Sequence, residues 1–173
     1  MDKATIQRQL HDTHEAFFAY LTGLSDADLL ARPNAKWSAL QQLEHIGRSV
    51  RPVRLAFHIP QAVMRGIWGG ADRPSKSYEA LVAKYQSKLD QGGRAPSPFV
   101  PRGGRLADRA RWVRRTRRQV RGLSRAVGRW SEQDLDACIL PHPLLGKVTL
   151  REMLYFTIHH VQHHQRLVER NLA

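Results

Sequence analysis

The sequence contains a single cysteine, Cys138, among 173 residues. One thiol cannot form an intrachain disulfide, and it cannot build a cysteine-rich zinc site or an iron–sulfur cluster. Any metal bound by this chain must therefore be held by histidine or carboxylate side chains. The sequence also lacks a run of eighteen apolar residues and an N-terminal segment of signal-peptide type. We therefore expect a cytoplasmic protein with no membrane partner.

Acidic residues are scarce as well. Lys and Arg number 28 against 15 Asp and Glu, so the formal net charge is +13. Much of the excess lies between Arg102 and Arg129, where eleven arginines accompany one acid, Asp108. Apolar residues recur in this segment at helical intervals, which favours a core helix with an arginine-rich exterior over a nucleic-acid contact surface. No glycine-rich RNA loop, zinc finger or aromatic RNA-binding pattern supports the second interpretation, which stays open.

The rest of the composition is typical of one globular domain covering residues 1–173, with 42% hydrophobic residues. Apolar periodicity predicts four long helices, at about residues 3–23, 38–57, 105–129 and 150–171. Capping-box patterns open the second, at Ser38 and Gln41, and the fourth, at Thr149 and Glu152. With no convincing strand, the prediction is an all-α four-helix bundle.

Residues 58–104 are expected to form an irregular, partly helical insertion between the second and third long helices. A short helix is predicted near residues 78–89, and the glycine- and proline-rich stretch after it is predicted to be a loop. The aromatic residues of the insertion are candidates for a lid over a functional site or for a small satellite core. They are Trp68, Tyr78, Tyr85 and Phe99.

Four histidines lie within six residues of the last predicted helix: His159, His160, His163 and His164. Histidines four residues apart project from one helix face and can converge on one ion. On a helical wheel, His160 and His164 face the bundle interior, whereas His159 and His163 point the other way. Since burying two imidazoles is costly unless their nitrogens are satisfied, the inward pair predicts metal binding. Hydrogen-bonded core histidines and surface chelation by the outward pair are the alternatives.

Three patches of the sequence resemble the DinB/YfiT superfamily of bacterial metal-binding four-helix bundles. They are Trp37 to Ile46, which contains His45; His142 to Gly146 with Thr149; and His160 to His164. Together with the first helix they cover most of the chain outside residues 58–104. The resemblance implies a DinB-like fold, a metal site made by His45, His160 and His164, and a homodimer.

His45 enters this site through the resemblance alone. The wheel places it roughly 150° from the centre of the apolar stripe of its helix, so a solvent-facing histidine beside Glu44 is the alternative. Many members of the family have an acidic residue where this chain has Gln41, so a carboxylate general base is not assured at that position. Glu44 is a weak candidate to replace it, since adjacent helical residues point about 100° apart.

Three neutral imidazoles suit zinc or nickel and leave coordination positions for water or substrate. Such an ion can activate water for hydrolysis or hold a thiolate for group transfer. The better understood branches of the resembled family look like metal-dependent, thiol-using transferases and isomerases. We therefore expect a hydrolase or thiol-dependent transferase acting on a small molecule, with a low-molecular-weight thiol as a candidate partner. A nucleic-acid-binding or DNA-damage-response protein, and a non-catalytic dimer stabilised by metal, are the alternatives.

Overall fold

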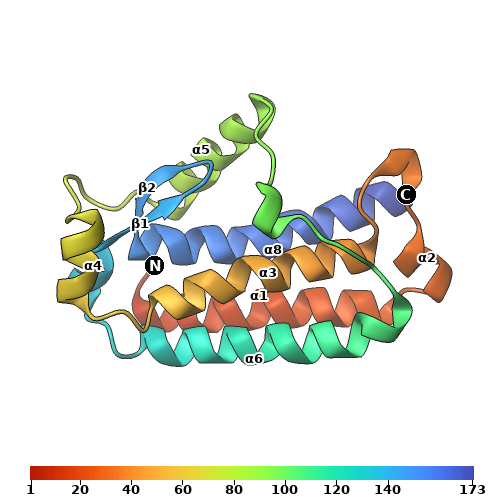
Figure 1. The fold of residues 1–173 in the computed structure, drawn as a ribbon, viewed down its shortest axis with the longest axis horizontal. Helices are drawn as coiled ribbons and strands as arrows, with labels where there is room; N and C mark the ends of the chain where they lie inside the picture. The colour runs from red at the N-terminus through yellow and green to blue at the C-terminus, as the bar shows by residue number, and fades with distance from the viewer.

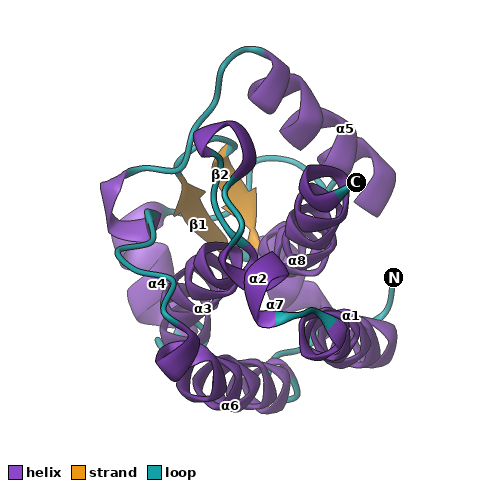
Figure 2. Ribbon diagram, turned by 90° about the vertical axis from the view of Figure 1, so that its right-hand side faces the viewer, coloured by secondary structure: helices purple, strands orange, loops and turns teal.

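The computed structural model describes residues 1–173, and its largest unit is a bundle of four helices (Figure 1). They are α1 (Lys3–Gly23), α3 (Ala39–Ala56), α6 (Arg109–Val127) and α8 (Leu150–Leu172). In the end-on view of Figure 2 these helices occupy four corners, with α1 and α3 each in contact with both α6 and α8. The predicted all-α bundle is confirmed.

The capping boxes predicted from the sequence open two of the bundle helices. The side chains of Ser38 and Thr149 accept hydrogen bonds from the backbone N–H groups of Gln41 and Glu152. The side chains of Gln41 and Glu152 accept in return from the backbone of the two capping residues. These bonds satisfy N–H groups that the first helical turn leaves unpaired, so they set the starts of α3 and α8.

A second layer covers α3 and α8 on the side away from α6 (Figures 1 and 2). It contains α4 (Gln61–Trp68), α5 (Tyr78–Asp90) and a hairpin of strands β1 (Ile139–His142) and β2 (Gly146–Thr149). Helix α5 packs on α8, and α4 packs on β1. Because of this layer, α8 is buried on every side from Leu150 to Val161.

The hairpin and α4 are additions to the predicted fold. Strands β1 and β2 pair antiparallel, with Leu140 opposite Val148 and Pro141 opposite Lys147. The expectation that the chain has no strand is wrong: each strand has only four residues and β1 contains Pro141, so neither shows enough alternation to be recognised. Pro141 is compatible with a two-stranded sheet, since each strand has an unpaired edge.

The remaining elements are short and join the bundle helices at their ends. They are α2 (Asp26–Leu30), α7 (Glu132–Ala137) and single 3₁₀ turns at Pro33–Ala35, Ser97–Phe99 and Leu106–Asp108. One core of 34 buried apolar residues runs through the bundle and includes Met64, Leu81 and Tyr85 of the insertion. None of the helices combines the length and the apolar character that crossing a bilayer requires.

Helices α3 and α6 approach each other closely at Gly47. A Cβ atom at this position would lie 2.6 Å from the Thr116 hydroxyl oxygen and 3.1 Å from the Trp112 ring. Real side chains do not tolerate the shorter contact, so glycine allows the two helices to pack at this distance. The contact brings the arginine-rich helix α6 directly against α3, which carries His45 on another face.

Candidate metal centre

The structure brings His45, His160 and His164 together in the interior of the protein. His45 comes from α3 and the other two from consecutive turns of α8, and they are 3%, 6% and 5% exposed. The Nε2 atom of His160 lies 3.2 Å from Nε2 of His45 and 3.0 Å from Nε2 of His164. The three candidate ligand atoms all lie within 4.8 Å of one another. The side chains from two helices therefore converge on one point.

Two of these rings are oriented by acceptors on their far side. His45 Nδ1 lies 2.7 Å from the Phe99 carbonyl oxygen, and His164 Nδ1 contacts the Gln42 side-chain oxygen. A carbonyl oxygen can only accept, so each Nδ1 carries the proton and donates it. In a neutral imidazole the other nitrogen, Nε2, is then a bare lone pair. Both lone pairs are directed at His160.

In this arrangement one of the two Nε2 lone pairs has no hydrogen-bond donor. His160 can place a proton on Nε2 and donate it toward one neighbour, but the second lone pair then faces no donor. A buried acceptor without a partner costs about 1–3 kcal/mol. A cation among the three Nε2 atoms removes that cost, and three nitrogens bound to one tetrahedral zinc at about 2.0–2.1 Å lie about 3.3 Å apart. The residues present therefore fit a metal ion.

The protonation state of the cluster favours metal binding in the same way. Burial lowers the pKa of His45, and the Phe99 carbonyl opposes that effect only in part. Burial lowers the pKa values of His160 and His164 well below 6.5, and the neighbouring imidazoles lower them further. All three side chains are thus neutral at physiological pH, which is the form that binds a metal.

A largely apolar pocket of about 920 Å³ opens beside the three histidines. Its walls come from α3, α4, α5, α8, the hairpin and the segment 93–100. The Trp37 ring lies 5.1 Å from the His45 ring and stacks on the His164 ring at 6.5 Å, centroid to centroid. Of the aromatic residues of the insertion, Trp68, Tyr85 and Phe99 line the pocket. Tyr85 also belongs to the core, so these side chains serve as a wall of the pocket and as packing.

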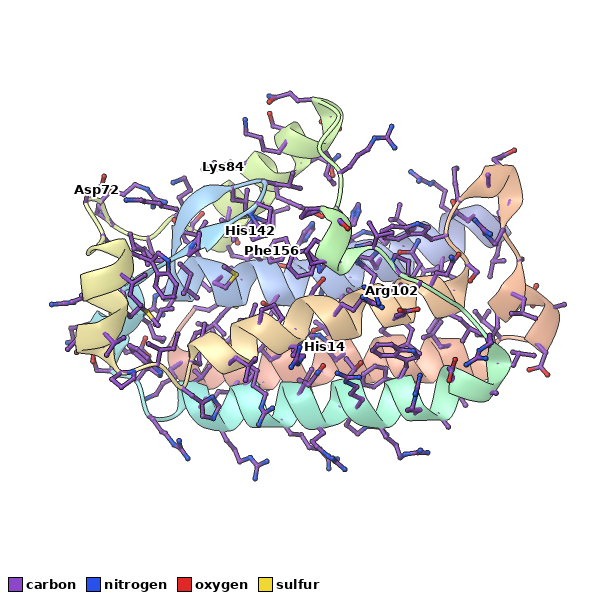
Figure 3. All side chains as sticks on the ribbon, in the orientation of Figure 1. His14, Asp72, Lys84, Arg102, His142 and Phe156 are labelled. Carbon is purple, nitrogen blue, oxygen red and sulfur yellow. The ribbon has the colours of Figure 1, made fainter.

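His142 lines the same pocket from the end of β1. Figure 3 shows it beside Phe156, and the two ring centroids are 4.2 Å apart. The backbone N–H groups of Leu144 and Leu145 both donate to His142 Nδ1, at 3.2 and 3.1 Å. Burial, with a contribution from Lys84, lowers the pKa of His142 to about 4. The ring is thus neutral with its proton on Nε2, which makes it a hydrogen-bond donor at the pocket wall.

Glu44, the weak candidate for a general base, lies next to His45 in sequence and is 4% exposed. Its carboxylate accepts from Arg48 at 2.6 and 2.9 Å, and from the backbone N–H groups of Arg102 and Gly103, both at 3.1 Å. It does not line the pocket. These contacts support anchoring of the segment that leads into α6 rather than proton transfer.

The helical wheel points His159 and His163 away from the bundle interior, but in the structure neither lies on the open surface. His159 is 8% exposed, and its ring lies 6.3 Å from Tyr78 and 5.9 Å from Tyr85. His163 lines the pocket and lies 5.8 Å from Tyr85. The wheel had treated the far side of α8 as solvent, whereas α5 covers it. Neither histidine belongs to the convergent cluster.

Gln42 is a functional candidate that was not predicted from the sequence. It lies three residues before His45, hence on the same face of α3, and its amide reaches His164 on α8. That spacing was the signal that would have identified it. The Phe99 carbonyl could not have been found in this way, because backbone acceptors leave no trace in the sequence.

Comparison with known proteins agrees with the fold and with the cluster. A family model described as the DinB superfamily matches residues 9–168. The match spans the three histidines and nearly all of the bundle. A search of curated proteins finds no match.

Proposed function

This chain belongs to the DinB superfamily, and from that premise we propose that it is a metal-dependent enzyme acting on a small, largely apolar molecule. One observation carries the proposal: three neutral, buried imidazoles direct their Nε2 atoms at one point beside a pocket of about 920 Å³. A closed structural metal site does not require an adjoining pocket, whereas a catalytic site does. Three protein ligands with open positions are the usual arrangement of catalytic zinc.

His45, His160 and His164 would hold the ion, with zinc or nickel as the metals suited to three imidazoles. The bound ion would supply Lewis-acid activation of a water molecule or of a thiol. Gln42 and the Phe99 carbonyl keep two of the imidazoles in the ligating tautomer. Trp37 and Phe156 each stack on one face of a ligand ring.

The pocket walls indicate the chemistry of the substrate. Most of the lining side chains are apolar, so a substrate gains affinity mainly by burying hydrocarbon. His142 offers one oriented N–H donor, suited to a carbonyl or similar oxygen of the substrate. Within the proposal this side chain binds and orients the reacting group.

A thiol used in the reaction would come from outside the chain. Cys138 is fully buried and is the only cysteine, so it cannot reach a substrate. A low-molecular-weight thiol is therefore the proposed co-substrate of a transfer reaction, and water that of hydrolysis. The homodimer implied by the family resemblance is also a proposal, which sedimentation of the purified chain tests directly.

Elemental analysis of untagged protein, purified without chelators, tests the metal. We expect about one zinc or nickel per chain, and its loss on replacing His45, His160 or His164 with Ala. Replacing His159 or His163 with Ala should leave the metal in place, which makes these two variants the matched controls. Wild-type protein without metal under zinc and nickel supplementation would overturn the proposed site.

Activity is tested on metal-loaded protein with apolar esters, amides and electrophiles, each with and without an added thiol. Product formation that a chelator abolishes and the metal restores supports catalysis. Thiol dependence identifies transfer, and thiol independence identifies hydrolysis. Stoichiometric metal with no turnover of any compound would favour the non-catalytic, metal-stabilised alternative.

A further inference from the structure

A cluster of arginine side chains lies on the side of the bundle away from the pocket. Nine arginines line two hollows where α3 and α6 meet, and two of them, Arg111 and Arg117, form ion pairs. We call the other seven the arginine face: Arg51, Arg54, Arg114, Arg115, Arg118, Arg121 and Arg125. Figure 3 shows nitrogen-tipped side chains extending from α6 away from the bundle. Helix α6 contacts α1 and α3, whereas the pocket is built over α8 and the other side of α3. The face is therefore separate from the candidate metal centre.

Two hollows on this face have no apolar lining residue. The larger, of about 420 Å³, is bordered by arginines of α3 and α6 together with Gln119. The smaller, of about 310 Å³, is bordered by arginines of α6 alone. Hollows lined by guanidinium groups suit anions, because each group offers several N–H donors in a planar fork.

Acidic side chains of the chain neutralise only two of the nine arginines that line the hollows. Glu15 pairs with Arg117, and Asp108 pairs with Arg105 and Arg111. None of the seven arginines of the face forms an ion pair with a carboxylate of the chain. Like charges at this density repel one another and lower stability unless anions screen them.

Arg54 shows that the face is shaped by the packing of the two helices. Its Nε atom is buried without a hydrogen-bond partner. A Cβ atom on Gly122 of α6 would lie 2.5 Å from that Nε atom, so only glycine leaves room for the Arg54 side chain to lie across α6. This contact adds an α3 guanidinium to the row on α6, at the cost of an unsatisfied donor.

The spacing of the exposed arginines on α6 and the residues around them indicate which kind of anion fits the face. Arg114, Arg118, Arg121 and Arg125 are spaced four, three and four residues apart, so they form one stripe about 16 Å long. None of the exposed large hydrophobic side chains lies on α6, so this helix has nothing to insert into a bilayer. The one aromatic residue of α6, Trp112, is half-buried. It packs against α3 at Gly47 and lies under the Arg115 guanidinium, so it offers no open ring face on which unpaired bases could stack, which argues against single strands.

We propose that the arginine face binds the phosphate backbone of duplex nucleic acid without reading its base sequence. Arginine contacts to phosphate supply affinity and position and carry no sequence information. The proposal does not depend on the metal or on catalysis. Its failure would leave the proposed enzyme untouched, and the reverse also holds.

Fluorescence anisotropy with a labelled duplex of about 20 base pairs of arbitrary sequence is the test. The full-length, metal-loaded chain is titrated at several salt concentrations from about 50 to 200 mM. If six or seven arginines contact phosphate, the affinity should fall about 10³-fold across this range. A second duplex of unrelated sequence should bind equally well. No binding at the lowest salt concentration would overturn the proposal.

Arginine replacement makes the test specific to this face. In the triple variant Arg114→Ala, Arg118→Ala, Arg121→Ala, the slope of log K against log salt should shrink by about 2.7, or 0.9 for each phosphate that no longer meets an arginine. These three side chains are exposed, so the fold should persist, and the thermal midpoint and metal content verify that.

The matched control removes three exposed arginines elsewhere, Arg8, Arg65 and Arg170, and should keep the wild-type slope. Equal slopes in the two triple variants would overturn the assignment to the arginine face. Vesicles containing phosphatidylserine form a third arm. Binding to vesicles but not to duplex would show that the face recognises lipid phosphate instead, and would also refute the proposal.

Discussion

Replacing Gln42 with Leu should weaken metal binding although Gln42 is not a ligand. The Gln42 side-chain oxygen accepts from His164 Nδ1 and thereby keeps the lone pair of His164 on Nε2, beside His160. Leu has a similar size and no acceptor. In the variant, the His164 proton can move to Nε2, and that tautomer must be reversed before an ion can bind.

Two physical effects set the size of the expected loss in zinc affinity. A buried N–H group that loses its acceptor costs about 1–3 kcal/mol. Loss of a partner that orients a metal-ligating histidine typically costs about 10–100-fold in metal affinity, which corresponds to about 1.4–2.8 kcal/mol. We therefore expect the zinc dissociation constant of Gln42→Leu to rise by about one to two orders of magnitude, with the stoichiometry unchanged.

Competition with a chromophoric chelator measures this constant in metal-free protein reloaded with zinc. Gln42→Glu is the matched variant, since it keeps an acceptor for His164 Nδ1 and should retain affinity near the wild-type value. Combining Gln42→Leu with His164→Ala should cost no more than His164→Ala alone, because Gln42 acts through that ring. An unchanged dissociation constant in Gln42→Leu would show that this hydrogen bond does not position the ligand.

Three further predictions concern stability and the segment next to the site. Burial lowers the pKa of His14 to about 4, so between about pH 6.5 and 4 the unfolded chain binds a proton at this residue that the native state does not bind. The free energy of unfolding should therefore fall as the pH drops through this range, by about 2 kcal/mol at pH 5. Urea titrations at several pH values should show that the free energy of unfolding depends less on pH in His14→Leu. Glu44→Gln should lower the free energy of unfolding by about 1–3 kcal/mol and speed hydrogen exchange at residues 99–104; a loss of kcat beyond about 100-fold at full metal occupancy would instead make Glu44 a base. Arg151→Leu removes ionic hydrogen bonds that join α8 to Glu132 and Asp136. The free energy of unfolding, measured by heat or urea, should fall by about 1–3 kcal/mol. An unchanged midpoint would show that water replaces those bonds.

The long helices could be predicted from the sequence because their signals are local. An apolar stripe and a capping box need only a few residues of context, and both are present at the starts of α3 and α8. Helix α4 and the hairpin depend instead on contacts between distant segments. The hairpin is stabilised by strand pairing such as Leu140 with Val148, and α4 by packing on β1. No local sequence pattern predicts either contact.

The site was predictable to the extent that it lies on one helix. The four-residue spacing of His160 and His164 identified two members of the cluster without reference to any family. His45 required the resemblance, because a wheel with one apolar stripe assumes that the opposite side of the helix faces water. The 3₁₀ turn at Ser97–Phe99 covers that side instead, and its Phe99 carbonyl accepts the His45 proton. The same assumption led to the wrong position for His159, which α5 covers.

Helix α3 explains why the single-stripe assumption fails in this protein. His45 lines the pocket, and Gln42 reaches His164 on α8. Gly47 and Arg54 lie against α6, and Leu43 belongs to the apolar core. Three contacts on different sides leave the first half of the helix almost no exposed surface, so its polar residues mark contacts rather than solvent. A buried polar side chain costs free energy unless it is paired. On such a helix each buried polar atom should therefore have a partner, and the exception on α3 is Arg54 Nε, which lies buried against Gly122 without one.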